Sequence, residues 1–382
     1  MKKKTNLLLL GMILIIYLMI LFLFKRQIFT YKFNKKLIDR YFCSQDIPYE
    51  PNCRRVWLSD EELHIAAGYL YAKGSDPAVI DFQHPPLIAY LYGFSILFFN
   101  NPYYLEIFFG LLFLSLIYLL GLKIFKSKLV STIGCLLLLI DPLFIDLSSQ
   151  ASYELGQAVF LLMYLILMVF YKKNFVLPGI ALGLLCASKF WGAAVFFVGI
   201  TALYKIINKE FNLKIFFYHL LIAFFTFSLT YLKSFLNQKF LFNIVFFQLK
   251  ILKYWIQHSI TNIPFASLVL FTTGFFKSWW GNYEILRSHV WSIIWPISLI
   301  SSFYVGIKNL IKNKTLTKIV FFSIIPLLYL IYLGVQAPFP RYFILILPFC
   351  YLSFAYSLSL KIKSKKIKPV FKNIIYFIEG IK

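Results

Sequence analysis

The chain has 382 residues, of which 60% are hydrophobic and 20% aromatic, and its 39 Lys and Arg against 15 Asp and Glu give a formal net charge of +24. Apolar runs near the length of a bilayer span recur along most of it, which excludes a soluble globular protein, and their lack of strict alternation excludes a membrane β-barrel. Most lysines lie in short clusters between these runs, so the basic charge indicates cytoplasmic loops and lipid headgroups and argues against a nucleic-acid partner. We expect an all-α, polytopic membrane helix bundle of about ten spans.

The first predicted span runs from Leu7 to Phe24, after the basic start Met1 to Lys4. Its length, and the lack of a small-residue cleavage pattern after it, favour a retained anchor over a cleaved signal peptide. The basic residues between Lys25 and Arg40 leave the local charge rule equivocal here. Later loops alternate between basic and non-basic ends, and this parity places both termini inside and residues 25–102 outside, as a long first outer loop.

One stretch of that loop, Ser59 to Leu87, concentrates ionisable residues in a chain otherwise poor in acid. It holds Asp60, Glu61, Glu62, Asp76, Asp81, His64 and His84. This concentration marks it as the candidate site. A structural explanation stands beside the functional one, because Ser59 and Glu62 match a capping box, in which an acidic first turn simply begins a helix.

The rest of the chain alternates long spans with shorter apolar segments. The run Pro85 to Phe99, of about fifteen residues, is the length of an interfacial or re-entrant helix. Phe175 to Tyr204 is expected to form two short helices with Lys189 near the outer tip. A second long outer segment, residues 233–290, contains two moderately apolar pieces that are either two extra spans or two interfacial helices. The other named spans are Tyr103–Leu122, Leu129–Leu147, Tyr153–Tyr171, Trp291–Gly306, Ile319–Gly334 and Tyr342–Leu360. We expect the whole chain, residues 1–382, to form one integral-membrane domain.

The cysteines and the aromatic residues give little evidence about function. Cys43 and Cys53 lie together in the first outer loop, where a disulfide is one possibility if that side is oxidising; their spacing does not indicate zinc. His64 lies one helical turn from Asp60, which is weak evidence for a metal, so we expect no metal or other cofactor. Several aromatic residues crowd the second outer segment, where an interfacial belt is favoured over stacking on a sugar: Trp279, Trp280, Tyr283, Trp291 and Trp295.

Several motifs in order resemble the C-type (GT-C) superfamily of membrane glycosyltransferases, in particular the protein O-mannosyltransferases and their bacterial, aminoarabinose-transferase-like relatives. The first is the pair Asp60 and Glu61, followed by His84-Pro85-Pro86-Leu87 ahead of an apolar helix. The segment Ile140 to Leu155 is similar to the family's second outer loop, Ala181 to Gly192 to its lysine-containing hairpin, and Pro338 to Phe349 to its late Arg-Tyr segment.

The resemblance implies transfer of a hexose or pentose from a polyprenyl-phosphate donor to a hydroxyl of a protein, lipid or glycan. It implies an inverting reaction on the extracytoplasmic face of a membrane, most simply a prokaryotic plasma membrane. Asp60 is then the general base and Glu61 orients or tunes it. The residues expected at the donor phosphate are His84, Arg341, Lys189, Gln150 and Glu154.

One departure from the family pattern affects the donor site. Where many relatives have Ser-Arg and then Asp, this chain has Ser149, Gln150 and Glu154. The phosphate contact is therefore left to Arg341 and Lys189, or to Arg54 and Arg55, since a guanidinium matches phosphate oxygens.

Two other classes of function stay open at this point. A secondary transporter or permease is disfavoured because ionisable residues lie mainly at interfaces and in outer loops, with Asp141 the main exception. A non-catalytic prenyl-lipid-binding relative is kept open by Gln150. Each candidate also has a plain structural reading: His84 can end an extended loop before two prolines, and Lys189 and Arg341 can simply reach the interface. The stretch Phe240 to Tyr254 suits a surface helix covering the lipid carrier.

Overall fold

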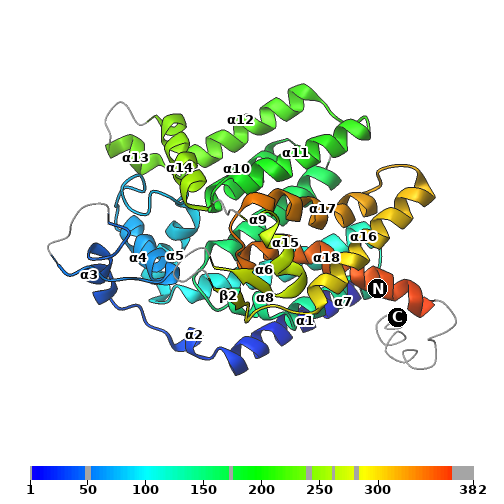
Figure 1. The fold of residues 1–382 in the computed structure, drawn as a ribbon, viewed down its shortest axis with the longest axis horizontal. Helices are drawn as coiled ribbons and strands as arrows, with labels where there is room; N and C mark the ends of the chain where they lie inside the picture. The colour runs from blue at the N-terminus through cyan, green and yellow to red at the C-terminus, as the bar shows by residue number, and fades with distance from the viewer. Residues whose placement is uncertain are drawn as a thin grey trace.

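The computed structural model of the protein describes residues 2–47, 53–171, 175–237, 243–259, 263–278 and 284–363. In these ranges the chain is a bundle of helices with one short hairpin (Figure 1). The helices of the first half are α1 (Lys2–Phe24), α2 (Gln27–Thr30), α3 (Lys36–Phe42), α4 (Asp60–Ala72), α5 (Leu87–Phe99), α6 (Tyr103–Phe125), α7 (Lys128–Leu139), α8 (Pro142–Leu147), α9 (Tyr153–Phe170) and α10 (Val176–Ser188). The second half contains α11 (Gly192–Ile207), α12 (Leu213–Leu229), α13 (Leu232–Asn237), α14 (Ile244–Ser259), α15 (Ala266–Thr273), β1 (Phe275–Lys277), β2 (Ile285–Arg287), α16 (Ile294–Asn313), α17 (Lys318–Tyr332), η1 (Leu333–Val335), η2 (Pro340–Leu345) and α18 (Leu347–Lys363).

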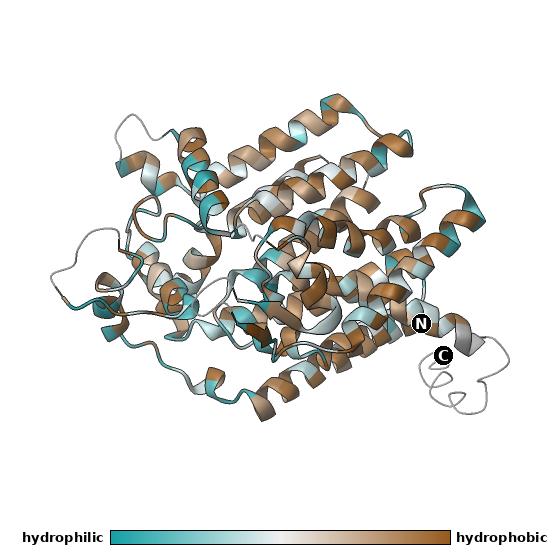
Figure 2. Ribbon diagram, viewed as in Figure 1, coloured by the Kyte–Doolittle hydropathy of each residue, from teal (hydrophilic) through white to brown (hydrophobic). Residues whose placement is uncertain are grey.

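Five helices of the described part are long and apolar enough to cross a membrane, and each matches a predicted span. They are Thr5–Phe24, Tyr103–Phe125, Tyr153–Phe170, Ile294–Asn313 and Lys318–Val335. The shorter apolar helices are α5, α7, α10, α11, α12 and the start of α18. Figure 2 shows hydrophobic residues along the middles of these helices and hydrophilic ones mainly at loops and helix ends, as expected of a multi-pass membrane protein.

Two predicted spans differ from the structure. The run Leu129–Leu147 is broken at Asp141 into α7 and α8, because Pro142 lacks a backbone N–H and begins a new helix that Asp141 caps by accepting from Phe144 N at 3.1 Å. The run Tyr342–Leu360 begins inside the 3-10 turn η2, before α18. An apolar run alone does not reveal either break.

The predicted hairpin and the two long segments between the spans are found, and we keep the names first and second outer segment for the latter. Lys189 lies between α10 and α11, at the end of the first helix. The second outer segment contains α14 and α15, and neither is among the helices with the length and composition of a span, which favours the interfacial alternative. Trp279, Trp280 and Tyr283 of the expected aromatic belt lie outside the described residues.

Trp295 does not belong to a surface belt. Its side chain is fully buried, and its indole N–H donates to Asp141 Oδ2 at 2.7 Å, which also accepts from the Tyr351 hydroxyl. This explains the acidic residue of the predicted span: Asp141 ties α8 to α16 and α18 inside the bundle.

The first outer segment lies at one end of the molecule, with α3, α4 and α5 together, and α1 begins at the other end (Figure 1). Its helices pack tightly because Gly68 of α4 faces Gly93 of α5; a Cβ built on Gly93 would come within 2.1 Å of Gly68 O. Cys43 and Cys53 form a disulfide, and Ser44 pairs with Val56 beside it. The chain just before α4 is thereby held in place.

Candidate functional site

A cavity of about 190 Å³ opens beside the start of α4, between the first outer segment, the start of α9 and the turn η2. Its lining combines acids, bases and aromatic rings: Asp60, Leu63, His64, Asp81, Gln83, His84, Tyr153, Glu154, Lys189, Trp255, Phe339, Arg341 and Tyr342. Five of the seven residues predicted for the site therefore meet here: Asp60, His84, Glu154, Lys189 and Arg341. They come from four regions far apart in the sequence: the segment around α4, the start of α9, the α10–α11 turn and η2.

The position of Asp60 follows from the capping box at the start of α4. Glu62 N donates to Ser59 Oγ at 3.2 Å, and Ser59 N donates to Glu62 Oε2 at 3.0 Å. The box fixes where the helix begins, so Asp60 occupies its first turn with the side chain 61% exposed at the cavity. The structural role expected for Glu62 is confirmed, and it leaves Asp60 available for another one.

Arg341 connects two carboxylates of the cavity. Its Nη1 lies 2.8 Å from Asp60 Oδ2, and its Nε lies 3.0 Å from Glu154 Oε1. Lys189 also bonds Glu154 Oε1, so the buried carboxylate lies between two cations, and the ammonium of Lys189 lies 4.6 Å from the centre of the Tyr342 ring. Two cations already held in place beside one cavity form a ready binding site for an anion, provided that the anion can compete with the carboxylates.

The ionisation of Asp60 is set by the same contact. Burial opposes its charged form, but the positive charge and hydrogen bond of Arg341 outweigh burial and lower the pKa of Asp60 below its ordinary value. Asp60 is therefore ionised at neutral pH, and as long as Arg341 stays bonded to it the carboxylate is a weak base.

Glu61 and Gln150 do not line the cavity. Glu61 Oε1 accepts from the backbone N–H of Ala151 at 3.0 Å, which joins α4 to the chain before α9. Gln150 Nε2 donates to Asp146 Oδ2 at 2.9 Å and is exposed. Both contacts are structural, and neither side chain shares the cavity with Asp60.

His64 lies on the wall of the cavity and is neutral. Its Nδ1 lies 3.0 Å from Ala151 O, and its ring stacks on Tyr153 with centroids 3.8 Å apart. Because the ring is buried, the pKa of His64 falls to about 4. The hydrogen bonded to Ala151 O is therefore on Nδ1, and Nε2 is left as an acceptor.

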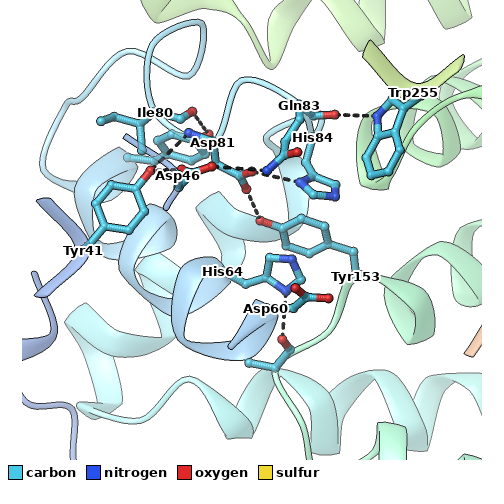
Figure 3. Close-up of polar contacts among 12 residues, drawn as sticks. Tyr41, Asp46, Asp60, His64, Ile80, Asp81, Gln83, His84, Tyr153 and Trp255 are labelled. Atoms are coloured by element: carbon cyan, nitrogen blue, oxygen red, sulfur yellow. Dashed lines mark hydrogen bonds and ion pairs between the residues drawn. The ribbon is translucent and has the colours of Figure 1, made fainter. Parts of the chain in front are cut away.

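A second imidazole is paired with a carboxylate that the sequence analysis gave no role (Figure 3). His84 Nδ1 lies 2.8 Å from Asp81 Oδ1, and Tyr153 donates to Asp81 Oδ2 at 2.8 Å. Trp255 of α14 packs against His84, ring centroids 5.4 Å apart, and its indole N–H donates to Gln83 O at 3.0 Å. The spacing of Asp81 three residues before His84 was a usable signal; the approach of Tyr153 and Trp255 was not visible in the sequence.

Two further cavities lie nearby. One of about 70 Å³ shares Lys189, Trp255 and Tyr342 with the charged cavity and continues between α11 and α17. The other, of about 400 Å³, is an apolar groove between α10, α11, α12 and α14, where Trp191 donates to Gln248 Oε1 at 3.1 Å. The charged cavity is thus close to a surface suited to a lipid chain.

Metal ligands do not gather in the described part of the chain. No group of three or more His, Cys, Asp or Glu side chains there is arranged to hold a metal ion.

Together, the apolar helices and the charged cavity define a multi-pass membrane helix bundle with a polar site where several helices begin or end. The fold is similar to two crystal structures of ArnT from Cupriavidus metallidurans, one bound to undecaprenyl phosphate and one in the apo state. The bound structure matches 85% of this chain with a TM-score of 0.59 at 13% sequence identity, and the apo structure 84% with a TM-score of 0.56, also at 13%. This chain spans 59% of the bound ArnT chain and 58% of the apo chain. No family model matches the sequence, and no curated protein matches it. The resemblance drawn from the motifs is confirmed for the fold.

Proposed function

We propose that the protein is an integral-membrane glycosyltransferase that moves a sugar from a polyprenyl-phosphate donor to an acceptor hydroxyl on the extracytoplasmic face. The observation that carries the proposal is the cluster of Asp60, Arg341, Glu154 and Lys189 around one cavity, which combines a carboxylate with two cations. Transfer of this kind needs a base for the acceptor proton and positive charge for the leaving phosphate.

The lipid part of the donor is supported by the fold and by the apolar groove. ArnT, whose fold is similar, was crystallised with undecaprenyl phosphate. In this chain the groove between α10, α11, α12 and α14 has the apolar lining that a prenyl chain needs, and Lys189 lies between α10 and α11 at the charged cavity. A prenyl chain in the groove would bring its phosphate toward Lys189 and Arg341.

The proposed reaction inverts the anomeric carbon. The acceptor oxygen forms a bond to that carbon while the bond from the carbon to the phosphate oxygen breaks, and its electron pair leaves with the phosphate. Arg341, Lys189 and His84 stabilise the phosphate, and Asp60 takes the proton of the acceptor hydroxyl. Glu61 contributes by holding α4 against the chain at Ala151, which fixes the direction of Asp60.

Arg341 couples the two halves of this reaction. It bonds Asp60 in the absence of donor, and this bond lowers the pKa of Asp60. A donor phosphate that draws the guanidinium away makes Asp60 a stronger base at the moment that the donor is in place. The base is then activated only in the loaded site.

The test is transfer of radiolabelled sugar from a panel of polyprenyl-phosphate sugars by the purified protein in lipid. Wild type is compared with Asp60→Asn and with Asp39→Asn, whose carboxylate is exposed on α3 of the same outer segment. We expect wild-type turnover that falls by about 10²–10⁴-fold in Asp60→Asn and is unchanged in Asp39→Asn.

The other outcomes contradict the proposal in distinguishable ways. A wild-type protein that binds undecaprenyl phosphate but releases no sugar from any donor is a prenyl-lipid-binding protein. One that binds no donor but takes up solute after reconstitution is a transporter. Full turnover by Asp60→Asn leaves the glycosyltransferase assignment standing and removes Asp60 as the base.

A further inference from the structure

Asp81 has a backbone conformation that a side chain rarely adopts. Its φ angle is +43°, in the left-handed region, where aspartate is tolerated better than most residues but still at a cost. The next residues form a tight turn, in which His84 N donates to Asp81 O at 3.1 Å, and Pro85 and Pro86 follow. The turn brings both ends of the Asp81 to His84 segment together, beside the cavity.

Three separate groups fix Asp81 in this conformation. Its backbone N–H donates to Tyr41 Oη at 3.3 Å, its Oδ2 accepts from Tyr153 at 2.8 Å, and its Oδ1 lies 2.8 Å from His84 Nδ1. The residue is 3% exposed. A buried carboxylate with both oxygens bonded in this way has one fixed orientation. It therefore also holds the imidazole bonded to it in one orientation.

The contact with Asp81 assigns the hydrogen on the His84 ring. A carboxylate accepts hydrogen bonds, so the hydrogen between Asp81 and His84 lies on Nδ1, and Nε2 is the atom left for the cavity. The ring cannot turn freely, because it packs against His64, Tyr153 and Trp255 with centroids 5.6, 5.2 and 5.4 Å away. Figure 3 shows His84 between the Asp81 carboxylate and the Trp255 ring.

We propose that Asp81 is a positioning residue, which Tyr41 and Tyr153 hold in place so that His84 presents Nε2 to the phosphate of the lipid donor. The proposal rests on the proposed function, because it takes a prenyl phosphate as the ligand. It adds a role for Asp81 and for the two tyrosines, and it explains why a strained aspartate stands three residues before His84.

The test measures the affinity of the full-length protein in lipid nanodiscs for undecaprenyl phosphate. We expect His84→Gln and Asp81→Asn each to weaken binding about tenfold or more, which is the scale of a hydrogen bond to a charged group. The double variant is expected to bind no more weakly than His84→Gln alone, because Asp81 acts through His84. Effects that multiply in the double variant, or wild-type affinity in Asp81→Asn, overturn the proposal.

The matched control is Asp76→Asn. Asp76 lies on the same loop, and its carboxylate caps Ala78 N at 2.9 Å and accepts from Asn237 at 3.3 Å, away from His84. Asp76→Asn shows whether a disturbance of the loop is by itself enough to weaken lipid binding. We expect this variant to keep wild-type affinity for undecaprenyl phosphate. Weakening by Asp76→Asn equal to that by Asp81→Asn assigns Asp81 a structural role only and overturns the proposal.

A spectroscopic readout covers the case in which affinity and folding change together. In protein labelled with ¹⁵N-histidine, the Nδ1–H signal of His84 is identified by its loss in His84→Gln. We expect it to move in Asp81→Asn and in Tyr153→Phe, which removes only the Oδ2 contact, and to stay in place in Asp76→Asn. An unmoved signal in Asp81→Asn overturns the proposal. Failure of the wild type to bind undecaprenyl phosphate is the separate result that overturns the proposed function itself.

Discussion

Arg341 Nη1 lies 2.8 Å from Asp60 Oδ2, joining residues 281 positions apart in the chain. The contact brings the 3-10 turn η2 onto the first turn of α4, and the other side of the same guanidinium lies against Glu154. One cation therefore serves a candidate base and a buried acid at once. Substitutions at Arg341 should affect both.

We expect Arg341→Lys to weaken binding of undecaprenyl phosphate about tenfold and Arg341→Gln to weaken it further. A lysine keeps the charge, but its single nitrogen cannot contact Asp60 and Glu154 together as the planar fork does. The control is Arg40→Gln, which removes a similar ion pair between α3 and α4, because Arg40 Nη1 lies 2.7 Å from Glu62 Oε1 at the exposed surface. Equal weakening by Arg40→Gln would trace the loss to net charge rather than to the cavity.

The buried pair of Glu154 and Lys189 gives a prediction about stability. Their side chains are 3% and 12% exposed, so removing one partner leaves an uncompensated buried charge. We expect Glu154→Gln to lower the free energy of unfolding by about 3 kcal/mol or more, and Glu154→Gln combined with Lys189→Met to recover much of that loss. Thermal unfolding in detergent at neutral pH measures both. A double variant less stable than the single one contradicts the assignment of a mutually compensating pair.

His64 gives a prediction about pH. Its folded-state pKa is about 4 against an ordinary 6.5, so between these values the unfolded chain binds a proton that the folded protein does not. Stability therefore falls as pH drops below 6.5, by about 2 kcal/mol at pH 5 from this residue alone. We expect His64→Asn, which can still donate to Ala151 O, to lose less stability than wild type between pH 7 and pH 5. Parallel losses in the two proteins would show that His64 is not the responsible group.

Asp60, His84, Lys189, Glu154 and Arg341 were predicted from ordered motifs that resemble the C-type glycosyltransferases. The structure brings these five side chains to one cavity. The motifs alone carried no information about the distances between them.

The motifs did not reveal the orientation of each side chain. Glu61 follows Asp60 directly, but successive residues of a helix point about 100° apart, so Glu61 contacts the neighbouring loop while Asp60 faces the cavity. Gln150 stands near Glu154 in the sequence but lies before α9 begins, and its amide pairs locally with Asp146. Asp81 was included in the candidate stretch but given no role, because its surroundings depend on Tyr41, Tyr153 and His84 meeting around it.

The predicted spans were inaccurate for a similar reason, because hydropathy does not show where a helix is interrupted. Hydropathy follows composition, so the run Leu129–Leu147 looked continuous although Asp141 and Pro142 divide it into α7 and α8. The structure explains the break. Trp295 and Tyr351 donate hydrogen bonds to Asp141, and these bonds stabilise a buried carboxylate at that position.

The crossing of α4 and α5 gives a last prediction, about the support of the site. Gly68 and Gly93 allow the two backbones to touch, and a Cβ at Gly93 would come within 2.1 Å of Gly68 O, a backbone atom that cannot turn aside. We expect Gly93→Ala to lower the free energy of unfolding by about 1–3 kcal/mol and to reduce sugar transfer, since α4 carries Asp60 and must move away from α5. The matched control is Gly199→Ala in α11, where no atom beyond the local helix backbone lies within 4 Å of the added carbon, and alanine there should be neutral or slightly stabilising. Thermal unfolding and transfer assays on both variants decide the matter. If Gly93→Ala is as stable and as active as Gly199→Ala, the close crossing does not hold the site.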